Sequence, residues 1–182
     1  MNQTNIVILG GGMVAGYAAK QLAELGLPKG ELAIVSADNT VPYERPPLSK
    51  SFLAGKDSED AIKINPDDFY KKQGIELRLE CEVASLDLKR KRLILKGGDE
   101  FGFQKLTIAT GARPRTLNIP GSTLQHLFYL RTLNDSKSIR NAAEKVKHAL
   151  VIGGGFIGME VAAVLAQKGI EVAMVLNDDR VF

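Results

Sequence analysis

Residues 5–16 are Asn5-Ile6-Val7-Ile8-Leu9-Gly10-Gly11-Gly12-Met13-Val14-Ala15-Gly16. An apolar, β-branched run of strand length enters a glycine cluster, and a helical pattern over residues 14–25 follows at once. This order is typical of a dinucleotide-binding fingerprint, G-x-G-x-x-G/A, with Gly10, Gly12 and Ala15 at the motif positions. Because the unpaired N–H groups of a helix start attract phosphate, we expect a pyrophosphate site here. Its residues are Gly10, Gly11, Gly12, Met13, Val14 and Ala15.

A second strand is expected at residues 31–36, after the helix-breaking run Gly26-Leu27-Pro28-Lys29-Gly30. The two strands and the helix between them form one βαβ unit, and Asp38 lies just past its end. A carboxylate in this place accepts hydrogen bonds from both hydroxyls of an adenosine ribose. The alternative is an ordinary turn aspartate, because the distance from Gly12 along the chain is somewhat long.

Residues 66–112 predict the remainder of a first domain. Proline and acids early and lysines late predict a helix over 66–73 that ends at Gly74. Alternating patterns predict strands at 75–80, 83–88 and 92–96, then a short strand after Gly97-Gly98, and a separate strand at 104–109. The strands from 83 onward are expected to form an antiparallel insertion, and a proline-bearing linker follows over 112–121.

The opening pattern recurs near the end of the chain. A helix over 134–145, capped by Thr132, precedes a strand at 149–152, a glycine turn, a helix at 159–168 and a strand at 170–175. Two complete strand–glycine–helix–strand units predict two dinucleotide sites and an α/β fold. The second site is assigned to Gly153, Gly154, Gly155, Phe156, Ile157 and Gly158.

Composition excludes several classes of function. The chain has 182 residues, a net charge of +3, 45% hydrophobic residues and 25% charged residues, which is ordinary for a globular protein. Cys81 is the sole cysteine, so there is no redox-active cysteine pair, and a reducing compartment, the cytoplasm, is expected. No metal motif, no nucleic-acid-binding stretch and no apolar run long enough for a bilayer is present, so no metal, nucleic acid or membrane is expected.

Three stretches together resemble one family. They are Ile-Leu-Gly-Gly-Gly-Met-Val-Ala-Gly-Tyr-Ala-Ala at 8–19, Pro-Tyr-Glu-Arg-Pro-Pro-Leu-Ser-Lys at 42–50 and Ile-Ala-Thr-Gly-Ala-Arg-Pro at 108–114. They resemble the two-dinucleotide flavoprotein reductases, such as ferredoxin and rubredoxin reductases, apoptosis-inducing factor and monodehydroascorbate reductase. The resemblance implies a Rossmann-like FAD-binding domain with an antiparallel β insertion at 1–115. The first βαβ unit of an NAD(P)-binding Rossmann domain follows at 116–182.

The resemblance also implies ligands of FAD. The first fingerprint would bind the pyrophosphate of FAD, and Arg45 and Lys50 would contact the flavin. The Lys50 ammonium would lie near the reactive edge of the flavin ring, where a cation stabilises the reduced form. Val83 would offer its backbone to the adenine. The remaining implied FAD ligands are Thr110, Gly111 and Arg131.

For the second fingerprint, the resemblance implies a nicotinamide nucleotide. Glu160 would lie near the nicotinamide and pair with Lys50; the alternative is a first-turn acid that the helix dipole favours. Asp178 stands where an acid of the family selects NADH by binding the ribose hydroxyls. Leu176 is apolar where another acid is usual, and Arg180 would favour a 2′-phosphate, so these two residues argue for NADPH. Because of Asp178, NADH is still expected ahead of NADPH.

The expected function is a reductase in which Lys50 and Glu160 are the catalytic residues. NADH would deliver hydride to FAD, and electrons would pass to a small acceptor or carrier such as ferredoxin, rubredoxin or monodehydroascorbate. The alternative is a truncated, non-catalytic dinucleotide-binding or interaction module. Because the sequence stops just after a second βαβ unit, we also expect an exposed sheet edge or apolar face that promotes self-association.

Overall fold

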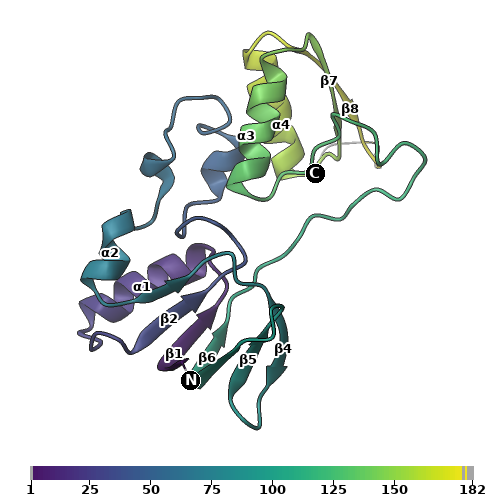
Figure 1. Cartoon of the computed structure of the whole chain (residues 1–182). Coiled ribbons are helices and arrows are strands. Elements are labelled where there is room, and N and C mark those ends of the chain that lie inside the picture. Colours follow the sequence, from purple (N-terminus) through teal and green to yellow (C-terminus); the bar gives the residue numbers. More distant parts are fainter. Residues whose placement is uncertain (1, 178, 180–182) are drawn as a thin grey trace. The chain divides into compact units, whose positions relative to one another are not determined.

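Each of the two repeated patterns lies in its own structural unit in the computed structural model of the chain, which describes residues 2–177 and 179 (Figure 1). The first unit comprises the residues up to 44 together with residues 63–112. The second comprises residues 45–62 and the residues from 113 onward. Residues 45–62 are therefore inserted in the sequence of the first unit while they belong to the second.

The first unit contains a six-stranded sheet with the order β3-β2-β1-β6-β5-β4. The strands β1, β2, β3 and β6 run parallel, whereas β5 pairs antiparallel with both β4 and β6. The bounds are β1 Asn2–Leu9, β2 Leu32–Val35, β3 Glu76–Arg78, β4 Val83–Asp87, β5 Arg92–Leu95 and β6 Glu100–Ile108. A parallel-dominated sheet with an antiparallel extension confirms the α/β fold class expected from the sequence.

Both faces of the central strands are covered. In β1, Ile8 packs into a cluster with Ala15 and Ala19 of the helix α1, which spans Met13–Glu24. Its neighbour Val7 points to the opposite face and packs with Phe101 and other side chains of the antiparallel strands. Successive side chains of a strand alternate between faces, so apolar residues at successive positions of β1 and β2 require cover on both sides.

The strand β6 corrects one expectation. The sequence predicted a short strand after Gly97-Gly98 and a separate strand over 104–109, but one strand runs from Glu100 to Ile108. It pairs with β1 from Phe101 to Ile108, and its first three residues also pair with β5. The first three residues pair on one side with β5, whereas β1 pairs with the strand along almost its whole length, so the backbone continues without a break.

The helices of the first unit end as their sequences predict. The residue after the C-cap of α1, Gly26, has a positive φ of 79°, and Gly74 has a φ of 66° just past α2, which spans Asp67–Lys72. Glycine adopts this left-handed conformation without the strain that a Cβ brings. In α2 the acids lie in the first turn and the lysines in the last, as the helix dipole favours.

The described residues of the second unit form two α-helices and a two-stranded parallel sheet. Their bounds are α3 Leu133–Ala143, β7 His148–Ile152, α4 Phe156–Gln167 and β8 Glu171–Val175, with short 3₁₀ turns at Pro46–Ser49 and Asp60–Ile62. The inserted segment packs against α3. The buried Ser136 hydroxyl donates to the Leu48 carbonyl at 2.7 Å, and the Arg140 guanidinium lies 4.8 Å from the centre of the Phe52 ring.

The start of α3 is held by a capping box. The Thr132 hydroxyl accepts from the Asp135 N–H at 3.2 Å, and the Asp135 carboxylate accepts from the Thr132 N–H at 2.7 Å. Since removal of an N-cap hydroxyl exposes helix donors, Thr132→Ala should lower the free energy of unfolding by about 1 kcal/mol. The matched control is Ser138→Ala, whose exposed hydroxyl bonds within the helix to Asn134. Denaturation followed by circular dichroism should show a clear loss for the first variant alone; equal losses would contradict the capping role.

Candidate functional site

The two glycine turns have the same backbone geometry. The first glycines, Gly10 and Gly153, have positive φ angles of 120° and 113°. The helix N-caps, Gly12 and Gly155, are extended, and as glycines they have no side chain that could cap the first N–H groups. The first N–H groups of α1 and α4 have no partner within their helices, so each turn presents donors and a positive dipole end to an anion.

Steric room explains the glycines of the first turn. A Cβ on Gly10 would lie 2.6 Å from the carbonyl carbon of Ala109, and one on Gly11 would lie 2.7 Å from the Ser36 Cβ. Just beyond the motif, a Cβ on Gly16 would lie 2.9 Å from the Pro42 Cβ. The turn therefore runs close to the carboxyl ends of β2 and β6. Sequence reasoning missed Ser36 and Gly16, although a glycine inside a helical pattern signals a close approach.

Asp38 follows β2, as the fingerprint requires, and its carboxylate is held on both oxygens. The Tyr43 hydroxyl donates to Oδ2 at 3.1 Å, and the Asn39 N–H donates to Oδ1 at 2.9 Å. The Asp38 N–H in turn donates to the Ser36 hydroxyl at 3.0 Å. Asp38 takes part in a turn and also presents a partly exposed carboxylate. A role as a turn aspartate and a role as a ribose ligand are therefore compatible. Sequence reasoning did not identify Tyr43.

The remaining candidate ligands of the first unit lie near the ends of strands. Thr110 and Gly111 follow β6, which is adjacent to β1 in the sheet; Thr110 is exposed and Gly111 has a φ of 68°. The Cys81 N–H donates to the Ser36 carbonyl at 2.8 Å, which brings the chain that leads into Val83 beside the end of β2. The first unit thus gathers its predicted residues around the carboxyl ends of parallel strands, where α/β proteins bind ligands.

One more feature of the first unit involves Tyr17 of α1. Tyr17 is half-exposed, and its hydroxyl donates a hydrogen bond to the Glu44 carboxylate. This hydrogen bond, together with slight burial and the charge of Glu44, raises the pKa of Tyr17 above its ordinary value.

In the second unit the third glycine of the fingerprint is sterically required. A Cβ on Gly158 would lie 3.2 Å from the carbonyl carbon of Gly153, so glycine allows α4 to approach the strand closely. The helix begins at Phe156, three residues earlier than expected, because the turn leads into it directly. Gly154 is partly buried, while Phe156 and Ile157 are exposed.

A three-residue cluster joins the inserted segment to α4. The Lys50 ammonium lies 3.3 Å from Glu160 Oε1, and the buried Ser49 hydroxyl donates to Glu160 Oε2 at 2.5 Å. The pair of Lys50 and Glu160 expected from the resemblance is thus present. Glu160 is the fifth residue of α4, and the first turn of that helix contains no acid. The alternative of a first-turn acid is therefore wrong. Sequence reasoning missed Ser49.

The two predicted arginine ligands also meet within the second unit. The Arg45 side chain donates through Nη1 to the Arg131 carbonyl at 2.5 Å, and the Arg131 N–H donates to Asp135 at 3.0 Å. Both arginines are partly buried. Asp178 and Arg180, on which the choice of nicotinamide nucleotide rests, lie outside the described residues.

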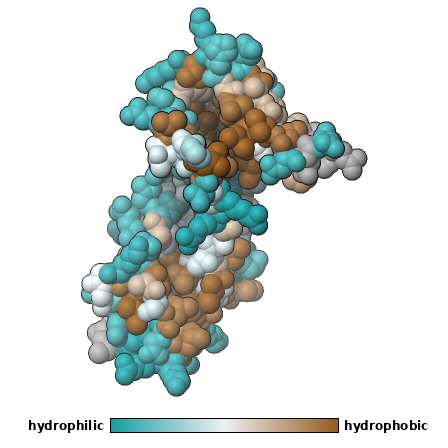
Figure 2. All heavy atoms as spheres, turned by 90° about the vertical axis from the view of Figure 1, so that its right-hand side faces the viewer, coloured by the Kyte–Doolittle hydropathy of each residue, from teal (hydrophilic) through white to brown (hydrophobic). Residues whose placement is uncertain are grey.

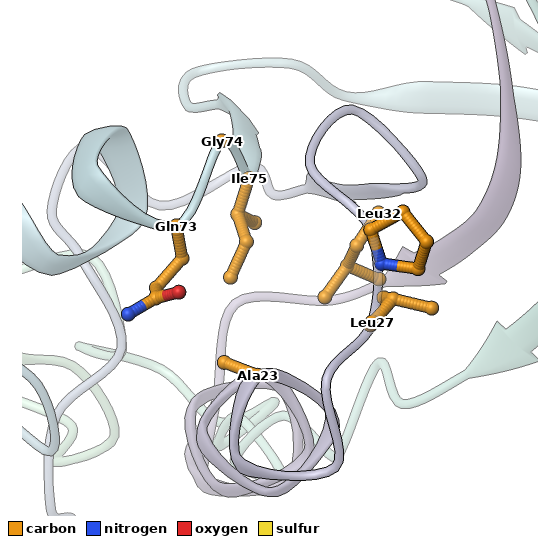
Figure 3. A pocket seen from close by; sticks show the side chains of 7 residues that line it. Ala23, Leu27, Leu32, Gln73, Gly74 and Ile75 are labelled. Atoms are coloured by element: carbon orange, nitrogen blue, oxygen red, sulfur yellow. The ribbon is translucent and has the colours of Figure 1, made fainter.

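A small pocket in the first unit is unrelated to these clusters (Figure 3). It lies at the C-terminal end of α1, away from the glycine turn, and has no charged lining residue. Its lining is Ala23, Leu27, Pro28, Leu32, Gln73, Gly74 and Ile75. Within the described part of the chain, no group of three or more His, Cys, Asp or Glu residues could hold a metal ion. Across residues 2–177 and 179, no helix is both long and apolar enough to cross a membrane.

Comparison with known proteins gives close relatives over nearly the whole chain. Rubredoxin-NAD(+) reductase of Pseudomonas putida is 38% identical over 176 residues, which cover 97% of this chain and 46% of the relative. Peroxisomal monodehydroascorbate reductase 1 of Arabidopsis thaliana is 40% identical over 188 residues, covering 94% and 43%. A ferredoxin reductase from Rhodopseudomonas palustris has a structure with a TM-score of 0.89 and 36% identity, covering 100% and 44%.

The chain thus spans less than half the length of these relatives. A family model described as pyridine nucleotide-disulphide oxidoreductase matches residues 4–182. This match confirms the resemblance inferred from the sequence, and the family that it names is one of oxidoreductases. The expected cofactors, FAD and a nicotinamide nucleotide, agree with membership of this family. With a match over almost every residue, the chain is a member of the pyridine nucleotide-disulphide oxidoreductase family.

Proposed function

We propose that this chain is the nucleotide-binding part of an NADH-dependent flavoprotein reductase. The first unit binds FAD at the turn that starts α1, and the second binds NADH at the turn that starts α4. The observation that carries the proposal is the repetition of one geometry: two glycine turns with matching φ angles, each leading into a helix through an extended N-cap glycine. Each turn offers backbone donors for one pyrophosphate.

The residues of the first unit fit a dinucleotide. A side chain at Gly10 or Gly11 would clash with Ala109 or Ser36, so the proposed phosphate turn requires glycine at both positions. Asp38 supplies a fixed carboxylate for a ribose. Val83 stays the proposed backbone neighbour of the adenine, and Thr110 and Gly111 stay proposed FAD ligands. FAD, when bound, accepts a hydride and releases electrons singly, which the protein's own side chains cannot do.

The residues of the second unit would supply charge and orientation. Arg45, Lys50 and Arg131 are the proposed cationic ligands of the flavin. The Lys50 ammonium, held by Glu160, is proposed to stabilise the negative charge that a flavin gains on reduction. Glu160 fixes that ammonium and, through its hydrogen bond from Ser49, is itself fixed. Asp178 remains the proposed acid that selects NADH over NADPH.

The acceptor is proposed to be a small oxidant or electron-carrier protein. The relatives are named for rubredoxin, monodehydroascorbate and ferredoxin, and these are the acceptors to test first. With Cys81 as its sole cysteine, the chain has no cysteine pair for disulfide chemistry. The same composition leads us to propose a reducing compartment, the cytoplasm.

The test is reconstitution of the purified chain with FAD, followed by anaerobic addition of NADH. Retained flavin absorbance that NADH bleaches, and that NADPH bleaches more slowly, is the expected result. A chain that binds neither nucleotide would overturn the proposal. A chain that holds FAD without being bleached would instead favour the alternative of a non-catalytic binding module for this piece.

Self-association is proposed to involve the outer face of β7 and β8. Ala149 and Val151 pack toward α4, whereas Leu150, Ile152 and Val175 are 60%, 50% and 48% exposed. Figure 2 shows hydrophobic side chains gathered on the side of this unit on which β7 and β8 lie in Figure 1. A two-stranded sheet with an uncovered apolar face is a surface that favours association.

We therefore expect light scattering at high concentration to show dimers or larger species. Leu150→Lys should weaken association about tenfold, because a charge would be buried in the contact. Leu88→Lys is the matched control, since Leu88 is 67% exposed in the first unit. A wild-type chain that stays monomeric, or equal effects of the two variants, would contradict the proposed face.

A further inference from the structure

Tyr43 is a buried aromatic residue whose hydroxyl reaches a partly exposed carboxylate. We propose that Tyr43 is a positioning residue that orients the Asp38 carboxylate to accept both hydroxyls of the adenosine ribose. The inference rests on the proposed nucleotide site of the first unit. It adds to that site a residue that lies outside the glycine fingerprint, in the loop that leads to Pro46.

Two hydrogen bonds, one on each oxygen, restrain the orientation of the Asp38 carboxylate. The Tyr43 side chain donates to Oδ2 at 3.1 Å, while the Asn39 N–H donates to Oδ1 at 2.9 Å. A carboxylate oxygen accepts two hydrogen bonds, so each oxygen keeps one acceptor position for a ligand. With one donor on each oxygen, rotation about the Asp38 side-chain bonds would break at least one of these bonds.

Tyr43 is itself fixed more firmly than Asp38. It is 2% exposed, and its backbone forms an isolated antiparallel bridge with Lys63. The preceding residue, Pro42, accepts a backbone hydrogen bond from Ile64 at 3.1 Å. Because the ring cannot follow the more exposed carboxylate, the carboxylate must take the orientation that the phenol dictates.

The geometry suits a vicinal diol. The two ribose hydroxyls are neighbouring donors, and a carboxylate recognises them best when both of its oxygens face them together. A carboxylate that is already oriented loses less conformational freedom on binding, so affinity for the diol rises. A nucleotide without these hydroxyls gains nothing from the orientation. Tyr43 is thus expected to act on diol recognition and not on phosphate binding.

The experiment compares two nucleotides on two tyrosine variants. ADP and 2′,3′-dideoxy-ADP are titrated into the chain, and binding to the first unit is followed by the NMR signals of the Gly11 and Gly12 amides. Tyr43→Phe should weaken ADP binding about fivefold and leave dideoxy-ADP binding within about twofold, as expected for the net contribution of one hydrogen bond. Tyr17→Phe removes the same atom from another carboxylate partner, Glu44, and should change neither affinity.

A second variant keeps the inference falsifiable. Asp38→Asn should abolish the preference for ADP over dideoxy-ADP, and adding Tyr43→Phe to it should have no further effect. Equal weakening of both nucleotides by Tyr43→Phe, or a preference that survives it, would overturn the inference while the site itself stands. If the wild-type chain binds no ADP or FAD in the first unit, the proposed function fails and the role of Tyr43 fails with it.

Discussion

Replacing Gly10 with alanine is expected to lower the free energy of unfolding of the first unit by about 3 kcal/mol. Two costs add at this position. The backbone has a φ of 120°, which strains a residue with a Cβ, and that Cβ would lie 2.6 Å from the Ala109 carbonyl carbon. The obstacle is backbone at the end of β6, so it moves only if the pairing of β1 with β6 is disturbed.

Two matched glycines separate these costs. Gly153 has a φ of 113° but nothing within 4 Å of its added Cβ, so Gly153→Ala should cost about 1 to 2 kcal/mol through strain alone. Gly97 has nothing within 4 Å and no positive φ, so Gly97→Ala should leave stability almost unchanged. Hydrogen exchange of the β1 and β7 amides would report the two units separately. A Gly10→Ala loss no larger than that of Gly153→Ala would show that the contact with Ala109 is unimportant.

Replacing Lys50 with methionine is expected to slow the reduction of bound FAD by NADH about a hundredfold. The prediction rests on the proposed function. An ammonium beside the flavin would stabilise charge that develops during hydride transfer, and methionine nearly keeps the length of the side chain without the charge. Lys50 is 55% exposed and pairs with Glu160 at 3.3 Å, so loss of the pair itself should affect folding little.

The control is Lys56→Met, an exposed lysine of the same inserted segment. Stopped-flow absorbance under anaerobic conditions gives the rate of flavin reduction, and flavin fluorescence gives the affinity for FAD. We expect Lys50→Met to lower the rate with FAD still bound, and Lys56→Met to change neither quantity. A hundredfold loss of FAD affinity with an unchanged reduction rate would assign Lys50 to binding and contradict the electrostatic role.

The sequence predicts those features that depend on local backbone requirements. Gly10 and Gly153 are predictable because a strand that turns directly into a helix requires a special φ at one position, and the structure has positive φ angles at both. Thr132 is predictable as a cap because its hydroxyl acts three residues along the chain. Such short-range rules need no knowledge of distant partners.

Features that depend on distant partners are harder to predict. The pairing of Lys50 with Glu160 follows from family resemblance alone, since no periodicity connects residues so far apart. Ser49 escapes sequence reasoning because nothing in its neighbours indicates that its hydroxyl will reach α4. The continuity of β6 escapes sequence reasoning because it depends on pairing with β1 along almost the whole strand, whereas only the first three residues also pair with β5.

The inserted segment also affects how the chain folds as it is synthesised. Residues 45–62 leave the ribosome before most of the first unit is complete, yet the α3 residue that binds their backbone, Ser136, emerges much later. In the interval the Leu48 carbonyl must stay hydrated or find another partner. The contact between the inserted segment and α3 can therefore form only after α3 has been synthesised. A shortened chain that begins after residue 112 would lack this loop, leaving the Ser136 hydroxyl without its acceptor.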